Sequence, residues 1–577
     1  MTRVQIGIHC SLQTDGSMPA DGNVAMSRDG QPIFAVAEER VSRRKYDGDF
    51  RQGLRYALDR TGVSAGQVEV VGVSTYSRYV ESSDADLDDI RTIVRAELGR
   101  KAAVEIARSH HEIHAFAAAA YCPEREALIA VLDNEGSLLG APTGDRAQWA
   151  FEKSSYYRRI GEDLELVARD HDGPGEVGYG KAYSKITRYL GFQSYQEAGK
   201  TMGLAPFGGP RGDFPQLFER RPGARNAMRN TQDGLKDLES WFEDHAVRLG
   251  GPRSGAPISK LQADLAYWIQ AELEASVFDR ARGLLAATQA KALAMSGGVA
   301  LNCVMNSRLR ALPVSDVFVP PSPGDAGLAV GVLAWLERRT QGRIPLFRGT
   351  PYLGGDYSAE AAKADLAPFA DQFHLDEVAD PVADAADHLA RGLIVGWMQG
   401  GSEYGPRSLG ARSILADPRQ PWMKEVLNNL VKGREWFRPY APAVLIERAG
   451  EFFEEPFGSP YMMHTARCRD LCIRSAPAAV HVDDTARLQT VHRDLNPMFH
   501  RLIEAFADRT GLPILLNTSF NLGGEPIVEK PSDVARTLLN CPRLDLAYVG
   551  AIRLRRREGA VTKRVKTSQA APASAFA

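Results

Sequence analysis

The sequence predicts an α/β protein built from more than one domain. Short apolar runs typical of strands are separated by longer segments in which apolar residues recur at helical spacing. With 577 residues the chain is too long for a single hydrophobic core, so we expect two domains or more. Its composition, 44% hydrophobic and 25% charged, is that of an ordinary soluble globular protein.

The chain begins with predicted strands, followed by helical segments. Residues 4–9 and 33–37 should form strands on either side of a turn-rich loop, and residues 86–107 have charged and apolar residues at helical spacing. An Ala-rich segment that begins near His110 should be helical. Residues 127–132, a continuous apolar run closed by polar turn residues, should form a buried strand.

The same alternation returns further along the chain. Residues 258–289 are helix-like, 291–295 are strand-like, and a Gly-Gly turn leads into a helix predicted from about Val299. Strands and helices in this order fit two similar α/β lobes, although the sequence shows no internal repeat.

Pro and Gly interrupt the helical pattern around residues 343–351, which places a domain boundary near residue 347. After about Arg556 the chain loses its apolar periodicity. We therefore expect a domain over 1–347, a second over 348–556 and a disordered tail over 557–577.

The charge balance argues against some partners. The net charge is −2 and the pI is near 6.7, so no overall field attracts nucleic acid or an anionic membrane. No apolar stretch approaches the roughly 18 residues of a membrane helix, and the start lacks the apolar run of a signal peptide. We expect a cytoplasmic protein that binds neither nucleic acid nor membrane.

The cysteines are scattered and read as reduced thiols. Cys468 and Cys472 are one helical turn apart, but no further thiols accompany them, so a structural metal site is not expected there. The six positions are Cys10, Cys122, Cys303, Cys468, Cys472 and Cys541.

Three blocks in the second half of the chain predict an anion site. They are Gly405–Ser413, Lys432–Pro442 and Leu516–Asn521. The first two blocks contain five cations, which lie within a span of 32 residues from Arg407 to Arg438. These cations stand among Gly, Pro and aromatic residues rather than in a helical pattern with acids. Arg forks suit bidentate binding of phosphate or carboxylate, and Lys adds a point charge. The alternative is a structural salt-bridge network.

The three blocks resemble those of the carbamoyltransferase family that includes the nodulation and antibiotic-tailoring O-carbamoyltransferases. The resemblance runs from Ala37-Glu38-Glu39-Arg40 to about Gly550. It implies an N-terminal domain like the tRNA threonylcarbamoyl-transfer subunit, with the two-lobed actin/Hsp70/sugar-kinase fold. It also implies a C-terminal α/β domain like the YrdC-type domains that form acyl adenylates.

The activity that the resemblance implies joins two reactions. Carbamoyl phosphate and ATP, the latter with Mg²⁺, would give carbamoyl-AMP in the C-terminal domain. The N-terminal domain would then transfer the carbamoyl group to a hydroxyl or amine of a small-molecule acceptor, such as an antibiotic precursor or another natural product. The resemblance leaves open the acceptor's identity and whether the enzyme is a monomer or a homodimer.

A metal site is predicted in the first domain. His110 and His114 are four residues apart on the expected helix, so both imidazoles project from one face, whereas His111 points away. In the resembling family, positions matching His110, His114, Asp133 and Asp325 bind one divalent metal. Imidazoles and carboxylates without thiolate suit Fe²⁺, which we favour, or Zn²⁺ or Mn²⁺. Surface histidines are the alternative interpretation.

Two segments of the first domain are candidates for nucleotide binding. Gly297 and Gly298 join a strand to a helix, where glycine lets the backbone approach a phosphate. By resemblance, Asn302 contacts the nucleotide, and Lys200 lies in a Gly-Lys-x-Met-Gly-Leu block that lines the same cleft. Gly199-Lys200-Thr201 is not a P-loop, because no glycine stands five residues before Gly199.

The resemblance also assigns the donor site of the second domain. Its positions matching Arg407, Lys432 and Arg438 bind carbamoyl phosphate and the ATP phosphates, with Lys432 and Arg438 as catalytic candidates. Arg487 matches a further arginine. Ser519 and Asn521 should contact phosphate or the carbamoyl group.

The chain departs from the family pattern at two positions. The family carries His-Asp-Ala-Ser-Ala-Ala where this chain has Ala20-Asp21-Gly22-Asn23-Val24-Ala25, so the histidine proposed as base is replaced by Ala20. Asp21, or His9 at the end of the first strand, is the candidate catalytic base. The second departure is Gly523, where relatives often have Arg or His.

These departures keep two alternatives open. A regulatory nucleotide-binding protein that has lost transfer would explain both changes. A tRNA threonylcarbamoylation enzyme would use bicarbonate and threonine in place of carbamoyl phosphate, although the near-neutral charge and the fused domains count against it.

Overall fold

The computed structural model of the chain contains two compact units. It describes residues 3–11, 20–75, 88–99, 102–139, 150–171, 178–192, 195–214, 216–218, 258–347, 349–454 and 457–559. The first unit comprises Met1–Ser42 and Tyr46–Arg348, and the second comprises Arg43–Lys45 and Gly349–Ala577. The sequence did not predict that residues 43–45 group with the second unit. From residue 560 onward, the predicted tail lies outside the described residues.

The first unit begins with a mixed sheet, which we call lobe one together with its helices. Among the described residues its strands lie in the order β3-β2-β1-β4-β5. β2 is antiparallel to β1 and β3 to β2, whereas β4 and β5 run parallel to β1. The elements are β1 Val4–Cys10, β2 Asn23–Arg28, β3 Gln31–Ala37, α1 Glu38–Ser42, α2 Arg51–Thr61, β4 Val68–Thr75, α3 Asp88–Leu98 and β5 Ala103–Ile106.

The second sheet of this unit, in lobe two, repeats that arrangement. β8 is antiparallel to β6 and β9 to β8, while β10 is parallel to β6 and β11 to β10. Two sheets of one topology confirm the predicted two-lobed fold of the actin/Hsp70/sugar-kinase class. The strands are β6 Glu126–Leu132, β7 Leu138–Leu139, β8 Ala150–Ile160, β9 Asp163–His171, β10 Ala292–Ser296 and β11 Val317–Phe318.

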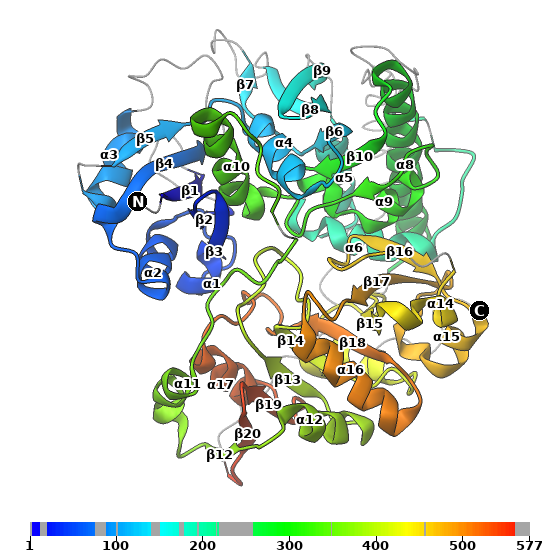
Figure 1. The fold of residues 1–577 in the computed structure, drawn as a ribbon. Coiled ribbons are helices and arrows are strands. Elements are labelled where there is room, and N and C mark those ends of the chain that lie inside the picture. Colours follow the sequence, from blue (N-terminus) through cyan, green and yellow to red (C-terminus); the bar gives the residue numbers. More distant parts are fainter. Residues whose placement is uncertain are drawn as a thin grey trace. The chain divides into compact units, whose positions relative to one another are not determined.

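Two helices pack between the two sheets of the first unit. α10 (Leu328–Gln341) lies on the sheet of lobe one, α4 (His110–Tyr121) lies on that of lobe two, and the helices contact each other (Figure 1). Gly331 permits this contact, because a Cβ there would lie 2.5 Å from the carbonyl oxygen of Ile113. The remaining helices that the structure describes in lobe two are α5 Tyr179–Tyr189, α6 Ala198–Leu204, α8 Lys260–Thr288 and α9 Cys303–Leu309.

The second unit is the predicted α/β domain, with one large mixed sheet. In the described chain its strand order is β12-β20-β19-β13-β14-β18-β15-β17-β16. The strands are β12 Phe373–Glu377, β13 Val395–Met398, β14 Arg412–Ala416, β15 Ala441–Leu445, β16 His464–Arg467, β17 Thr485–Val491, β18 Ile514–Ser519, β19 Leu546–Val549 and β20 Ile552–Arg556. The helices are α11 Ala359–Leu366, α12 Pro381–Ala390, α13 Met423–Val426, α14 Ala449–Phe452, α15 Asp470–Ser475, α16 Pro497–Thr510 and α17 Pro531–Asn540.

Most predicted elements are confirmed, and three differ. β2 was not predicted, because its buried Asn23 and Ser27 hide the apolar pattern. Residues 103–106, inside the predicted helix 86–107, form β5, which owes its strand conformation to pairing with β4. The helix predicted from Val299 begins at Cys303, after a 3₁₀ turn over Gly298–Leu301.

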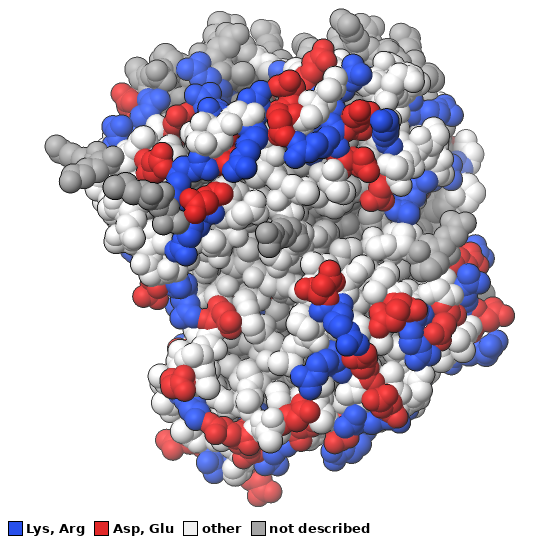
Figure 2. Space-filling model, in the orientation of Figure 1, with Lys and Arg blue, Asp and Glu red and all other residues white. Residues whose placement is uncertain are grey.

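The surface charges, the helices and the thiols add three observations. Figure 2 shows Lys and Arg interspersed with Asp and Glu on the face in view. None of the helices in the described ranges combines the length and the apolar character needed to cross a membrane. All six cysteines, each within the described residues, are buried and none forms a disulfide, as expected for reduced thiols.

Candidate active site

Four side chains from three elements of the first unit meet at one point. α4 begins at His110 because the Ser109 side chain accepts the Glu112 N–H at 3.1 Å, and the alanines that follow favour helix. This start places His110 and His114 on one face of the first turn. Asp133 directly follows β6, and Asp325 begins the 3₁₀ turn before α10.

The four side chains form what we call the His/Asp cluster. The two Nε2 atoms of His110 and His114 lie 3.2 Å apart. Each lies 3.2–3.3 Å from one oxygen of Asp133 and one of Asp325. Four donors bound tetrahedrally at about 2.0 Å lie about 3.3 Å from one another, so this spacing fits a single divalent ion. The histidines and Asp133 are buried, while the Asp325 side chain is 26% exposed and marks the open side.

Further hydrogen bonds orient His114 within the His/Asp cluster. The Ser296 hydroxyl donates to the Pro323 carbonyl at 3.1 Å, and its oxygen lies 3.2 Å from Nδ1 of His114. Because the Ser296 proton is used in the bond to Pro323, the Ser296 oxygen can only accept a hydrogen bond from His114. Neutral His114 therefore carries its proton on Nδ1, and the lone pair of its Nε2 faces the cluster. Ser296 was not identified from the sequence, since nothing local links it to His114.

The Gly297–Gly298 turn, which is predicted to bind a nucleotide, is hydrogen-bonded to the His/Asp cluster. Gly298 N–H donates to Oδ1 of Asp133 at 3.1 Å, while Oδ2 of the same carboxylate faces the two histidines. Gly297 has φ of 86°, and a Cβ there would lie 2.2 Å from the Leu132 carbonyl oxygen. Only glycine fits such a position, which lets the turn lie directly against the end of β6.

Asn302 and Lys200 have clear structural partners. The Asn302 side chain caps α9 by accepting the Met305 N–H, and it exchanges hydrogen bonds with Gln270 at 2.8 and 3.1 Å. The Lys200 ammonium lies 2.5 Å from Glu197 and over the ring of Phe192. A nucleotide contact by either residue stays a prediction.

The two candidate bases occupy different environments. His9 is fully buried on β1, and its ring centroid is 5.7 Å from that of His110. Burial lowers the pKa of His9 to about 3, against the opposing effect of Asp325. Asp21 is partly buried and has φ of 57°, the left-handed conformation that Asp adopts in turns. The described contacts therefore place His9 beside the cluster.

In the second unit, the sheet brings together the three sequence blocks that predicted an anion site. β14 pairs with β18, β18 with β15, and β15 with β17. The first block leads into β14, the second into β15, and the third ends β18. Arg487 lies on β17, the next strand along.

Lys432 is held at the junction of two of these blocks. It ends a π-helical turn over Leu427–Lys432, a form common at functional sites. Its buried ammonium donates to the carbonyl and hydroxyl of Ser519 and, at 2.8 and 2.9 Å, to the carbonyl and side-chain oxygens of Asn521. Burial, with the charges of Arg434 and Arg438, holds the pKa of Lys432 well below its usual value.

Several cations crowd around Lys432. Burial, followed by the charge of Arg434, lowers the pKa of Arg438 to about 10, and Arg487 acts in the same direction. Arg434 stacks on Tyr440 at 4.4 Å and donates to Asn428 at 2.8 Å. Arg434 was not chosen from the sequence, although its Lys-x-Arg spacing from Lys432 was visible. Cations that depress one another's pKa values in this way favour a bound anion.

Arg412, one of the five cations in the blocks, has a structural role instead. It is fully buried, and its guanidinium donates to the carbonyl oxygens of Gln399, Gly400, Ala411 and Gly355. A Glu403 carboxylate oxygen accepts the backbone N–H groups of Leu409, Ala411 and Arg412. These bonds fix the loop that carries the partly exposed Arg407.

Gly523 lies against the Lys432 backbone. A Cβ at this position would be 2.6 Å from the Lys432 carbonyl oxygen. An Arg or His there would force the Asn521–Glu525 turn away from Lys432. This departure from the family pattern thus changes how the predicted donor site is packed.

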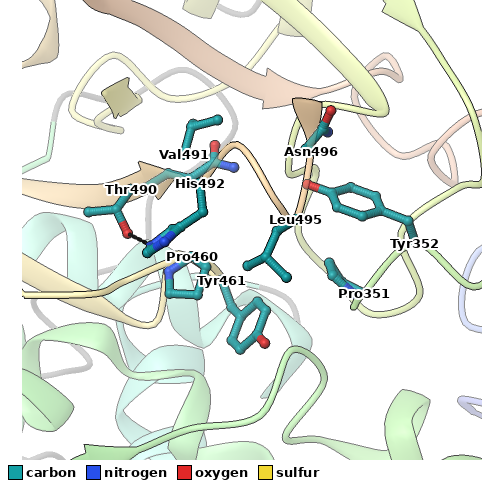
Figure 3. A pocket seen from close by; sticks show the side chains of 10 residues that line it. Pro351, Tyr352, Pro460, Tyr461, Thr490, Val491, His492, Leu495 and Asn496 are labelled. Carbon is teal, nitrogen blue, oxygen red and sulfur yellow. Dashed lines mark hydrogen bonds between the residues drawn. The ribbon is translucent and has the colours of Figure 1, made fainter. Parts of the chain in front are cut away.

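A hollow of about 230 Å³ in the second unit lies outside the predicted donor site (Figure 3). Its lining includes Tyr352, Tyr461, His492 and Leu495 but none of the predicted site residues. Tyr352 and Gln489 both donate to the Leu409 carbonyl. Residues that line the hollow therefore stabilise the loop that carries Arg407.

The comparisons with known proteins agree on one family. Residues 85–334 match the family model for the carbamoyltransferase N-terminus, and residues 386–556 match that for the carbamoyltransferase C-terminus. The chain is 33% identical to nodulation protein NolNO of Sinorhizobium fredii, over 95% of this chain and 80% of the relative. It is 28% identical to a 3'-hydroxymethylcephem-O-carbamoyltransferase of Streptomyces clavuligerus, over 89% of this chain and 94% of the relative.

Similarity to solved structures is weaker. A full-length HypF in a phosphate- and nucleotide-bound form aligns with 59% of this chain and 56% of its own, at 11% identity and a TM-score of 0.35. That score is too low to establish a shared fold. The family models and the relatives give the conclusion: this chain belongs to the carbamoyltransferase family and is a transferase.

Proposed function

We propose that the chain is an ATP-dependent carbamoyltransferase with one reaction in each unit. In the second unit, water hydrolyses carbamoyl phosphate to carbamate and phosphate, and the carbamate oxygen attacks the α-phosphorus of ATP, giving carbamoyl-AMP and pyrophosphate. In the first unit, an acceptor hydroxyl attacks the carbamoyl carbon, AMP leaves, and the hydroxyl proton passes to a base. The observation that carries the proposal is that each unit has its own cluster, one cationic and one of two imidazoles with two carboxylates.

The donor chemistry rests on the cations around Lys432. Fixed positive charges stabilise the charge that builds on departing pyrophosphate, and they need no rearrangement as it forms. Lys432, oriented by Ser519 and Asn521, serves as a point charge. Arg407, Arg438 and Arg487 supply planar forks for phosphate oxygens. Arg434 joins this set, because its charge acts on both Lys432 and Arg438.

The transfer site rests on the His/Asp cluster. His110, His114, Asp133 and Asp325 would hold a divalent ion, with Fe²⁺ the first choice and Zn²⁺ or Mn²⁺ as alternatives. When bound, such an ion supplies Lewis-acid polarisation of a carbonyl and lowers the pKa of a hydroxyl. The Gly297–Gly298 turn would let a nucleotide approach the backbone beside the cluster, and its own two N–H groups, which donate to the Pro323 carbonyl and to Asp133, hold the turn in place. Ser296 keeps the His114 ring in the required tautomer.

The acceptor is proposed to be a small molecule with a reactive hydroxyl. The relative from Streptomyces clavuligerus is named for O-carbamoylation of a hydroxymethyl group. ATP and carbamoyl phosphate, mixed with the chain and Mg²⁺, should release pyrophosphate. No pyrophosphate release from folded protein would favour the regulatory alternative, and release only with bicarbonate and threonine would favour threonylcarbamoylation.

The base of the transfer step can be located with two variants. A general base contributes about 10²–10⁴ to the rate. We expect His9→Gln to slow carbamoyl transfer within that range, because the His9 ring lies beside His110. Asp21→Asn should lower stability slightly and spare transfer, because the described backbone places Asp21 in a turn.

Pyrophosphate release in the second unit is the folding control for both variants. A transfer-deficient Asp21→Asn beside an active His9→Gln would move the base to Asp21. Activity in both would mean that the acceptor hydroxyl is acidic enough to need neither residue.

Metal affinity should depend on pH. Burial lowers the pKa of His110, but the charges and hydrogen bonds of Asp325 and Asp133 outweigh it and raise that pKa to about 10. An ion must displace this proton, so the apparent affinity should rise about tenfold per pH unit from pH 7 toward 10 and then level off. The stability that protonated His110 gives the metal-free chain is lost over the pH range in which metal affinity rises. Chelator competition with Zn²⁺ at pH 7, 8 and 9 measures the slope, and a flat profile would show that His110 is already neutral.

A further inference from the structure

Asn23 is a buried amide at the start of β2, in lobe one. It is 2% exposed and pairs across the sheet with His9. Residues directly opposite in neighbouring antiparallel strands present their side chains on the same face. Asn23 therefore shares the face on which His9 approaches the His/Asp cluster.

The Asn23 amide makes three hydrogen bonds, two of them to the turn before α10 and to the start of α10. Its Nδ2 donates to the Asp21 carbonyl at 2.6 Å and to the Asp325 carbonyl at 2.9 Å. Its Oδ1 accepts the Ala329 N–H at 2.8 Å. The Asn23 amide thus faces one N–H donor and two carbonyl acceptors. Its oxygen must point to the N–H and its nitrogen to the two carbonyls, so the flipped amide is excluded.

The bond to Ala329 caps a helix from a distant strand. The first N–H groups of a helix lack partners within it, and no side chain at its own N-cap serves α10. The turn Asp325–Gly327, which leads into α10, also lacks a local side-chain cap. Asn23 supplies both an acceptor for the helix start and a donor for the Asp325 backbone, 302 residues away in the sequence.

We infer that Asn23 is a positioning residue that holds Asp325 in place for metal binding and ties the Asp21 turn to the same point. The inference rests on the proposed metal site. Asp325 is the most exposed of the four cluster side chains and stands on an otherwise uncapped turn, so its backbone needs an external anchor. Serine, which the family pattern carries here, has a single donor and cannot serve both carbonyls.

The test is the Zn²⁺ affinity of the full-length chain, measured by chelator competition. Asn23→Asp keeps the shape of the side chain but removes both donors. Loss of a partner that orients a metal ligand typically costs about 10–100-fold in affinity, and we expect a loss of that size. The Co²⁺-loaded variant should also show a changed visible absorption spectrum, which a purely structural role would leave alone.

Ser27→Ala is the matched control. Ser27 is fully buried on the same strand and donates to Gln5, and its loss should leave Zn²⁺ affinity unchanged. Wild-type affinity in folded Asn23→Asp would overturn the inference. If Asn23→Asp does not fold, Asn23→Ser, with one donor left, should show a smaller loss, and unchanged affinity there would overturn it too. A wild-type chain that binds no Zn²⁺, Fe²⁺ or Mn²⁺ would instead refute the metal site of the proposed function, and the inference with it.

Discussion

His110→Ala is expected to lose both its metal and carbamoyl transfer. Removing a hydrogen-bond partner of a metal ligand already costs about 10–100-fold in affinity, so removing a ligand should cost more than about 100-fold. Purified wild-type protein should hold about one divalent ion per chain if the four donors bind tetrahedrally as their spacing suggests. Metal content by elemental analysis and transfer of labelled carbamoyl groups measure the two losses. Pyrophosphate release should persist, because that chemistry is assigned to the second unit.

His111→Ala provides the matched control for this experiment. His111 is the next residue on α4 and is also fully buried, but its Nδ1 contacts Ser155 at 2.8 Å, and it is not part of the His/Asp cluster. Its substitution tests the loss of a buried imidazole without the loss of a ligand. Full metal content in a His110→Ala/His114→Ala double variant would rule out the assigned site.

Arg438→Ala is expected to reduce pyrophosphate release by about 30- to 1,000-fold. Loss of one charged partner of a phosphate in transfer costs about 2–4 kcal/mol. Burial, followed by the charge of Arg434, lowers the Arg438 pKa, and Arg487 adds to the shift, so a bound anion would stabilise the charge of Arg438. Arg407→Ala and Lys432→Ala should act in the same direction. Arg438→Ala is the cleanest of the three, because Lys432 also bonds Ser519 and Asn521 within the fold.

Arg448→Ala serves as the control in the same unit. Arg448 is a half-buried residue whose side chain pairs with Glu451 at the surface, and such surface pairs contribute little to stability. It should release pyrophosphate at the wild-type rate. Normal turnover of carbamoyl phosphate in all three site variants would place the anion site elsewhere.

Local spacing explains why much of the fold was predictable. Strand 127–132 and helix 258–289 follow from continuous or periodic apolar residues, which specify an element without reference to the rest of the chain. β5 was not predicted, because its four residues form a strand only through their hydrogen bonds with the neighbouring strand β4. The same limit applies to β2, whose buried polar residues have their partners elsewhere in the fold.

The role of each cation was less predictable than its presence. Arg412 and Arg438 stand in similar Gly- and Pro-rich surroundings, yet Arg412 is enclosed by carbonyl oxygens, whereas Arg438 has the charges of Arg434 and Arg487 and the carboxylate of Glu435 near it. Sequence spacing reports which charges are near one another along the chain. Only the neighbours in space determine whether a charge is satisfied internally or left for a ligand.

By itself, the sequence determined the α/β class, the His110/His114 pair, the glycine turn at 297–298 and the three blocks that carry the family resemblance. Helix and strand periodicity, turn chemistry and contiguous motifs are local properties, so a linear pattern records them. The tertiary structure decided which distant groups act together. It placed Asp325 against His114 across 211 residues and anchored it through Asn23, because strand order and helix packing, rather than spacing along the chain, set those distances.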